Sequence, residues 1–320
     1  MTDTNAIPTQ GTPMGGTELI LANLKSALPE LTGQVQFIMS RPETVPLENK
    51  PRILWLQDVP HDPALAPLKD PSYRSRFNRI VFCSHWQQQQ YNYHLQIPFS
   101  DGIVIRNAVP HMASSFPKPR EDGKLKFLYT SAPYRGLGIL AKAAETLSKL
   151  RLDWRLDVYS SLNLYGWHKA DKKFEDLYRD LRQNPCVSYH GSVANAEVRE
   201  ACLKAHVWVY PSIYPETSCM AAQEAMMAGC LAITSNLGAL PETCGAWAWM
   251  FGADERPDAM IQRTLDNMRQ AIDSYDDPNL STMLQLQSIY YRDFWAFDKR
   301  LPAWQELLRA VISEGVPHCT

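Results

Sequence analysis

The sequence predicts an α/β protein built as two parallel-sheet halves, the first shorter than the second. The chain has 320 residues, of which 45% are apolar, enough for two domains that each bury a core. Short apolar runs alternate with amphipathic helical patterns, as parallel sheets require. Residues 110–123, which are rich in proline and charge, separate the halves and are predicted to be an interdomain linker.

The first half lacks the usual opening of such a domain. Its predicted strands are residues 52–56, 80–84 and 102–106. Residues 17–28 are predicted to be a helix because Leu21, Leu24 and Leu28 share one face. No strand-like run precedes the glycine pair before this helix, so either the first strand is absent or the sheet is reduced.

The second half repeats the alternation more completely. Its predicted strands are residues 126–130, 155–160, 187–190, 207–210 and 231–234. A long helical pattern then runs from about residue 281 to 313. We therefore expect an N-terminal domain at 1–118, a C-terminal domain at 119–290 and a terminal helix at 291–320.

Composition excludes several function classes. The formal net charge of −2, with basic residues spread along the chain, gives no electrostatic case for a nucleic-acid partner or an acidic membrane surface. Seven cysteines without a C-x-x-C pair argue against a disulfide framework or a zinc cluster and favour a reduced, cytoplasmic setting. The polar first residues do not resemble a signal peptide, and no apolar stretch is long enough for a transmembrane segment.

A strand, a loop and a helix at residues 207–229 carry the most informative pattern. The predicted strand ends at Tyr210, and the predicted helix, residues 217–228, is capped by Gly229. Glu216 lies in the loop between them. Because ligands of parallel sheets bind beyond the carboxyl ends of the strands, we expect Glu216 at the binding edge.

The predicted helix adds a second carboxylate and an anion site. Glu224 follows Glu216 by eight residues, about two helical turns, and lies on a nearby face. The free N–H groups of Thr217, Ser218 and Cys219 are expected at the helix start, where a pyrophosphate could bind. One carboxylate can accept hydrogen bonds from sugar hydroxyls and the other from ribose hydroxyls. The alternative is an ordinary amphipathic helix with two solvated glutamates.

This segment resembles the retaining glycosyltransferases of the family 4 type. Their signature is P-S-x-x-E, seven residues, then E-A-M-A-x-G. The matching positions are Pro211-Ser212, Glu216, Glu224-Ala225-Met226 and Ala228-Gly229, with one extra loop residue and Met227 inserted. The resemblance covers most of residues 80–310. It implies the GT-B fold of two Rossmann-like domains, the N-terminal one short in this chain.

The resemblance implies three further donor-binding positions. Gly15 and Gly16 match a Gly-Gly turn that approaches the donor phosphates, or belong to a flexible tail. Arg135 matches a phosphate-binding cation, or is a surface arginine. His190 and Gly191 match the loop that seats the base, or form a turn with a capping histidine.

The acceptor side has fewer signals. Asp58 and His61 follow a predicted strand where the family places a histidine near the reacting sugar, and either could orient the acceptor. The favoured alternative is that both belong to an ordinary polar loop. Trp295 and Trp304 lie in a tail that resembles the family's terminal helix, which crosses back to the first domain.

Two other functions remain open from the sequence. Gly136, Gly138 and Ala141 match G-x-G-x-x-A with Asp157 downstream, a dinucleotide fingerprint that would indicate an NAD-dependent oxidoreductase. However, five residues separate Gly136 from the preceding strand, where the fingerprint requires a direct turn. The family's upstream arginine is also missing, which leaves a catalytically inactive sugar-nucleotide-binding protein as the second alternative.

The resemblance therefore implies a retaining hexosyltransferase of carbohydrate biosynthesis. It would move a sugar from a UDP-, GDP- or ADP-sugar to the hydroxyl of a glycan or other acceptor. We expect no cofactor and no metal ion, because the sequence has no D-x-D pair and its eight histidines are scattered. The sugar, the base and the acceptor are not specified by these residues.

Overall fold

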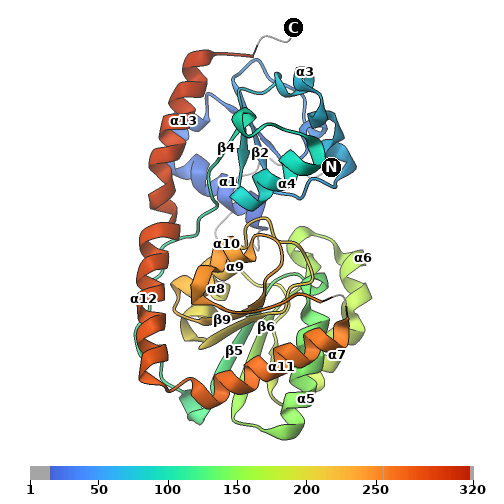
Figure 1. Cartoon of the computed structure of the whole chain (residues 1–320), viewed down its shortest axis with the longest axis vertical. Helices are drawn as coiled ribbons and strands as arrows, with labels where there is room; N and C mark the ends of the chain where they lie inside the picture. The colour runs from blue at the N-terminus through green and yellow to red at the C-terminus, as the bar shows by residue number, and fades with distance from the viewer. Residues whose placement is uncertain (1–14, 255, 318–320) are drawn as a thin grey trace. The chain divides into compact units, whose positions relative to one another are not determined.

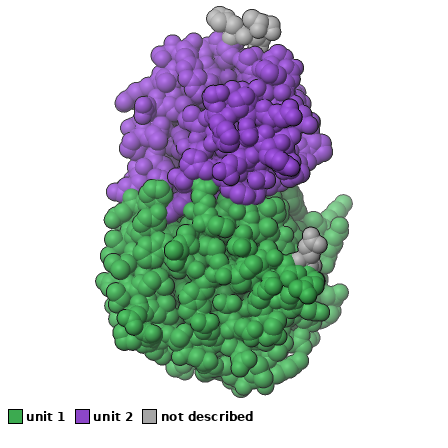
Figure 2. All heavy atoms as spheres, viewed as in Figure 1, with its two compact units in different colours: residues 1–15, 110–215, 219–294 green, residues 16–109, 216–218, 295–320 purple. Residues whose placement is uncertain are grey.

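The computed structural model describes residues 15–254 and 256–317 and separates into two compact units. Unit 1 comprises residues 1–15, 110–215 and 219–294, and unit 2 comprises residues 16–109, 216–218 and 295–320 (Figure 2). Each unit contains one parallel sheet. Within the part of the chain that is described, no helix has both the length and the apolar character that a membrane span needs.

Unit 2 holds a four-stranded sheet in the simple order β1-β2-β3-β4. Its strands are β1 (Gln36–Met39), β2 (Arg52–Leu56), β3 (Arg79–Phe82) and β4 (Gly102–Val104). Its helical segments are α1 (Gly16–Ala27), α2 (Pro29–Thr32), η1 (Pro42–Thr44), η2 (Pro63–Lys69), α3 (Pro71–Arg74), α4 (His85–Leu95) and η3 (Phe99–Asp101). The sequence analysis missed β1, a strand of only four residues. The first described element of unit 2 is the helix α1, and the first strand is β1. The residues before Gly15 lie outside the described chain.

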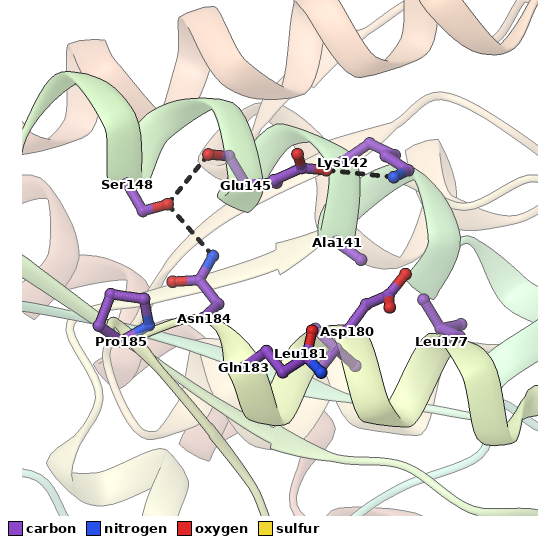
Figure 3. Close-up of a pocket in the computed structure, with 10 residues that line it drawn as sticks. All are labelled: Ala141, Lys142, Glu145, Ser148, Leu177, Asp180, Leu181, Gln183, Asn184 and Pro185. Atoms are coloured by element: carbon purple, nitrogen blue, oxygen red, sulfur yellow. Dashed lines mark hydrogen bonds and ion pairs between the residues drawn. The ribbon is translucent and has the colours of Figure 1, made fainter.

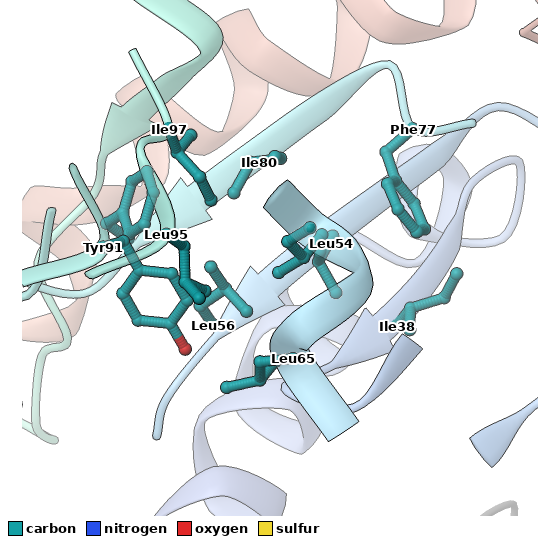
Figure 4. Close-up of a cluster of buried hydrophobic side chains, with 11 residues drawn as sticks. Ile38, Leu54, Leu56, Leu65, Phe77, Ile80, Tyr91, Leu95 and Ile97 are labelled. Atoms are coloured by element: carbon teal, nitrogen blue, oxygen red, sulfur yellow. The ribbon is translucent and has the colours of Figure 1, made fainter. Parts of the chain in front are cut away.

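One face of this sheet forms a hydrophobic core (Figure 4). Leu54 and Leu56 point to the same side because side chains alternate along a strand. Two helical segments, η2 and α4, also contribute to this core. Their residues in it are Leu65, Leu68, Tyr91 and Leu95. Tight packing of η2 and α4 against the sheet fixes the loops that leave β2 and β3.

The C-terminal helical segment packs on the opposite face of the sheet. The predicted helix 281–313 is in fact α12 (Pro278–Trp295), the short turn η9 (Phe297–Arg300) and α13 (Leu301–Glu314). In α13 the indole of Trp304 lies 4.4 Å from that of Trp55 in β2. Glu314 forms an ion pair with Arg79 of β3. The C-terminal helix therefore belongs to unit 2, although most of α12 belongs to unit 1.

Unit 1 has a six-stranded parallel sheet in the order β10-β9-β8-β5-β6-β7. Figure 1 labels β5, β6 and β9 of this sheet. Its strands are β5 (Leu125–Thr130), β6 (Trp154–Tyr159), β7 (Val187–Tyr189), β8 (Val207–Tyr210), β9 (Leu231–Ser235) and β10 (Trp249–Phe251). Its helical segments besides α12 are η4 (Glu121–Gly123), η5 (Pro133–Arg135), α5 (Leu137–Leu150), η6 (Leu162–Tyr165), α6 (His168–Asp171), η7 (Lys172–Phe174), α7 (Glu175–Gln183), α8 (Asn195–Lys204), α9 (Met220–Met227), α10 (Leu240–Cys244), η8 (Gly245–Trp247) and α11 (Pro257–Ser274). The five predicted strands are present, and only the three-residue β10 was missed.

The strand order of unit 1 creates a topological switch point. The first strand of the unit, β5, pairs with β6 on one side and with β8 on the other. The chain therefore winds outward in both directions from this pair. In doubly wound sheets the crevice for a ligand opens at the carboxyl ends of such a central pair.

The segment predicted to be a linker is packed into unit 1. Lys118 is buried, and its ammonium donates to the carbonyl oxygens of Cys202 at 3.1 Å and Ala205 at 2.5 Å. Phe116 fills the space beside Gly229, where an added Cβ would come within 2.2 Å of the ring. The unit boundary accordingly falls between residues 109 and 110.

Candidate functional site

Two loops meet at the switch point of unit 1. One follows β5 and carries Arg135 and Gly136, and the other follows β8 and begins with Pro211. Gly136 has a φ of +117°, and a Cβ there would lie 2.2 Å from the carbonyl oxygen of Pro211. Only glycine satisfies both the left-handed backbone and this close approach. Gly136 is therefore explained by contact with the neighbouring loop, without a dinucleotide.

Arg135 is held between aromatic rings at this point. Its guanidinium carbon lies 4.5 Å from the ring centre of Tyr214 and 5.6 Å from that of Tyr134. Stacking on a ring face fixes the plane of a guanidinium while its N–H groups remain directed outward at the edge. The half-buried side chain is thus a pre-oriented cation at the carboxyl edge of the sheet.

Buried serine hydroxyls organise the β8 loop. The hydroxyl of Ser212 donates to the carbonyl oxygen of Tyr214 at 2.8 Å. The hydroxyl of Ser235, at the end of β9, donates to the carbonyl oxygen of Ser212 at 2.7 Å. The P-S pair of the signature therefore has a structural task, which is to shape the loop that leads to Glu216.

The helix after this loop starts later than predicted. α9 begins at Met220, and Cys219 is its N-cap residue with a φ of −82° and a ψ of 92°. Thr217 and Ser218 are not helical, so their N–H groups are not part of a helix terminus. The N–H groups at the start of α9 are instead those from Cys219 onward.

The segment 216–218 belongs to unit 2, where it meets the loop after β2. The hydroxyl of Thr217 donates to the carbonyl oxygen of Gln57 at 2.6 Å, and the thiol of Cys83 donates to the carbonyl oxygen of Thr217 at 3.5 Å. Glu216, beside them, is buried with 4% of its surface exposed. The structure thus brings Glu216 to the carboxyl ends of β2 and β3.

The predicted acceptor residues occupy different environments in this loop. The carbonyl oxygen of Asp58 accepts from the Gln87 amide at 2.9 Å and from the Tyr91 hydroxyl at 3.1 Å, which pins the backbone there. His61 is exposed and its ring lies edge-on to that of His94 in α4, 4.3 Å away. Asp58 therefore lies on a fixed backbone, whereas His61 packs on α4.

Glu224 and Arg199 form a pair inside unit 1. Glu224 is in α9, its side chain is 13% exposed, and burial raises its pKa from 4.5 to about 7. Arg199 of α8, at 3.8 Å from the carboxylate, opposes that rise. Sequence reasoning missed Arg199, because α8 carries an unremarkable polar pattern and only the tertiary structure shows that α8 packs beside α9.

His190 is fixed by two neighbours at the ends of β6 and β7. Its Nε2 lies 2.9 Å from the carboxylate of Asp157, and its ring stacks on Tyr159 with 4.4 Å between ring centres. Gly191 follows with a φ of +70°, which suits a tight turn. Asp157, the acidic residue of the apparent dinucleotide fingerprint, therefore pairs with His190.

Gly15 and Gly16 stand at the start of α1. A groove between α5 and α7, lined by Glu145, Leu181 and Asn184 among others, contains none of the predicted site residues (Figure 3). In the described chain, no group of three His, Cys, Asp or Glu side chains is placed to hold a metal ion.

Comparisons with known proteins show what the sequence and the fold resemble. A family model described as glycosyl transferases group 1 matches residues 125–270. No curated protein sequence matches the chain significantly. A glycosyltransferase from Rickettsia africae is similar in structure with a TM-score of 0.69 and 13% identity, covering 93% of this chain and 82% of that one.

Two further solved structures show the same fold. Sucrose-phosphate synthase from Thermosynechococcus elongatus has a TM-score of 0.65 and 12% identity, with 93% of this chain and 78% of that chain covered. The Anabaena protein HepE in complex with UDP and glucose has a TM-score of 0.63 and 14% identity, with 82% and 72% covered. The chain therefore has the GT-B fold, and its residues 125–270 match the family model of group 1 glycosyltransferases.

Proposed function

We propose that this enzyme transfers a hexosyl group from a nucleoside-diphosphate sugar to an acceptor hydroxyl, with retention at the anomeric carbon and without a metal ion. The observation that carries the proposal is the switch point of unit 1. There, the loop with Arg135 touches the loop that continues through Glu216 into α9. A diphosphate fits this chemistry because both a stacked guanidinium and a helix N-terminus favour an anion.

The proposed roles follow from charge and position. Arg135 and the N–H groups at the start of α9 stabilise the charge that develops on the leaving nucleoside diphosphate. Glu216 accepts hydrogen bonds from the hydroxyls of the transferred sugar, and Glu224 from those of the ribose. His190 and Gly191 line the place of the base. Asp58 and His61 orient the acceptor hydroxyl.

The two glutamates provide the test. We expect Glu224→Ala to weaken both the donor and the free nucleoside diphosphate, since both contain ribose. Glu216→Ala should leave nucleoside diphosphate binding nearly unchanged and lower kcat with the donor, because a misaligned sugar cannot react. Glu200→Ala, at an exposed carboxylate of α8, is the matched control and should alter neither property.

The measurements are calorimetry with UDP, GDP and ADP, and initial rates of transfer or hydrolysis with the matching glucose conjugates. UDP is the first probe, because the structurally similar HepE contains UDP. If both alanine variants keep wild-type rates and affinities, the two carboxylates have no part in donor binding and the proposed function is wrong.

A further inference from the structure

Thr217 occupies the middle of the short segment 216–218, which belongs to unit 2. It lies in a bend before α9, so its position depends on contacts with other parts of the chain and not on helical hydrogen bonds. Only 9% of Thr217 is exposed, and its hydroxyl donates to the carbonyl oxygen of Gln57 at 2.6 Å. That distance is at the short end of the range for a hydrogen bond between two oxygens.

The acceptor of this hydrogen bond is itself held in place. The N–H group of Gln57 donates to the hydroxyl of Ser40 at 3.1 Å. The side-chain amide of Asn107, which is buried, donates to the amide oxygen of Gln57 at 2.7 Å. The main chain and the side chain of Gln57 are therefore both fixed, and its carbonyl oxygen is a rigid acceptor for Thr217.

The main chain of Thr217 has a second contact in unit 2. Its carbonyl oxygen lies 3.5 Å from the thiol of Cys83. The N–H group of Cys83 donates to the amide oxygen of Gln87 at 2.8 Å, and the amide nitrogen of Gln87 donates to the carbonyl oxygen of Asp58 at 2.9 Å. Thr217 is thus tied through its side chain to the loop after β2 and through its main chain to the end of β3.

Glu216 shares this placement because one peptide bond joins it to Thr217. With 4% of Glu216 exposed, its side chain has little room to compensate for a shift of the main chain. A misplacement of about 1 Å in a group that positions a substrate can cost about 100-fold in rate. The position of the Glu216 carboxylate is therefore sensitive to the hydrogen bond that its neighbour makes.

We propose that Thr217 is a positioning residue, whose hydrogen bond to Gln57 sets the place of the Glu216 carboxylate beside the transferred sugar. The inference rests on the proposed function, which gives Glu216 that role. It assigns a task to the side chain of a residue that the sequence analysis expected to bind an anion through its N–H group. Thr217 should accordingly affect the reaction of the sugar and not the binding of the nucleotide.

The test compares two substitutions at position 217 with one elsewhere. Thr217→Val replaces the hydroxyl with a methyl group, and Thr217→Ser keeps the hydroxyl. Thr264→Val is the matched control, because the hydroxyl of Thr264 in α11 is fully buried and donates to the carbonyl oxygen of Met260 at 2.7 Å. The measurements are initial rates of UDP-glucose hydrolysis, calorimetry with UDP, and melting temperatures, with the GDP or ADP ligands used where UDP does not bind.

We expect Thr217→Val to lower kcat about 3- to 10-fold, the range for loss of a neutral hydrogen bond. Its affinity for UDP should be unchanged, because free UDP lacks the transferred sugar. Thr217→Ser should keep a kcat close to that of the wild type. Thr264→Val should lower the melting temperature, as Thr217→Val does, but leave kcat unchanged at temperatures where both variants are folded.

A double variant separates positioning from a general effect on structure. In Glu216→Ala there is no carboxylate to place, so adding Thr217→Val should not lower kcat further. Two losses that multiply would mean that Thr217 acts by another route, and the inference would be wrong. Where Glu216→Ala is too slow to measure, the Val and Ser variants decide, since equal losses of kcat would show that the hydroxyl has no part.

The behaviour of Glu216→Ala distinguishes a failure of this inference from a failure of the proposed function. If Glu216→Ala is slow while Thr217→Val keeps the wild-type kcat, or weakens UDP binding as much as it lowers kcat, only the inference about Thr217 is wrong. If Glu216→Ala keeps the wild-type rate, the proposed role of Glu216 is wrong and the inference falls with it. A wild type that neither binds a nucleoside diphosphate nor hydrolyses a donor would overturn both.

Discussion

Replacing Glu224 with Gln should make the protein more stable above neutral pH. Burial raises the pKa of this carboxyl from 4.5 to about 7, even though Arg199 nearby acts in the opposite direction. A rise of that size, at 1.36 kcal/mol for each pKa unit, corresponds to about 3 kcal/mol. Glutamine has nearly the same shape as the protonated acid and carries no charge at any pH. It therefore removes the cost of burying the ionised form.

The sign follows from proton binding in the two states. Between pH 4.5 and 7 the folded protein retains a proton that the unfolded chain has lost, so this group makes the folded state less stable as pH rises. The ionised carboxylate destabilises the folded state fully when the pH is above the folded-state pKa. It does not do so when the pH is below the pKa of the unfolded chain. The free energy of unfolding of Glu224→Gln should thus equal that of the wild type near pH 4. At pH 8 it should exceed the wild-type value by about 3 kcal/mol.

Urea denaturation of both proteins between pH 4 and 8 measures this difference. Other titrating groups, such as the buried His206 whose pKa burial lowers to about 4, affect both proteins alike and cancel in the comparison. Glu200→Gln, at an exposed site, should show no pH-dependent gain. A difference between Glu224→Gln and the wild type that stays constant over this range would refute the account of a strained, buried carboxylate. Loss of donor affinity in the same variant would show that the strain serves function.

Three more predictions follow from the switch point and from the proposed chemistry. Gly136→Ala should lower the melting temperature by several degrees, because its Cβ would collide with the Pro211 carbonyl at a φ of +117°; an unchanged melting temperature would contradict that packing. Arg135→Ala should weaken nucleoside diphosphate binding by calorimetry by about 1.5–3 kcal/mol, whereas Arg155→Ala, on β6, should not; equal affinities would place the phosphate site elsewhere. Transfer rates should survive excess EDTA, and loss of activity restored by manganese would overturn the metal-free mechanism.

Much of the fold of unit 1 follows from local sequence. Strands such as Val207–Tyr210 are continuous apolar runs, as strands buried on both faces must be, and glycine and proline mark their ends. The spacing of Glu216 and Glu224 is likewise a property of the chain itself. The short strands Gln36–Met39 and Trp249–Phe251 escaped detection because runs this short have no measurable periodicity.

The remaining features depend on residues distant in sequence. Thr217 leaves the predicted helix because its hydroxyl finds the carbonyl oxygen of Gln57, 160 positions earlier in the chain. Arg199 forms an ion pair with Glu224 on another helix, and this contact depends on the packing of α8 against α9. The pattern of apolar residues along a segment indicates which face of a helix or strand is buried, because that depends on residues close in sequence. Which side chains meet at the site is decided only when the sheet order brings distant loops together.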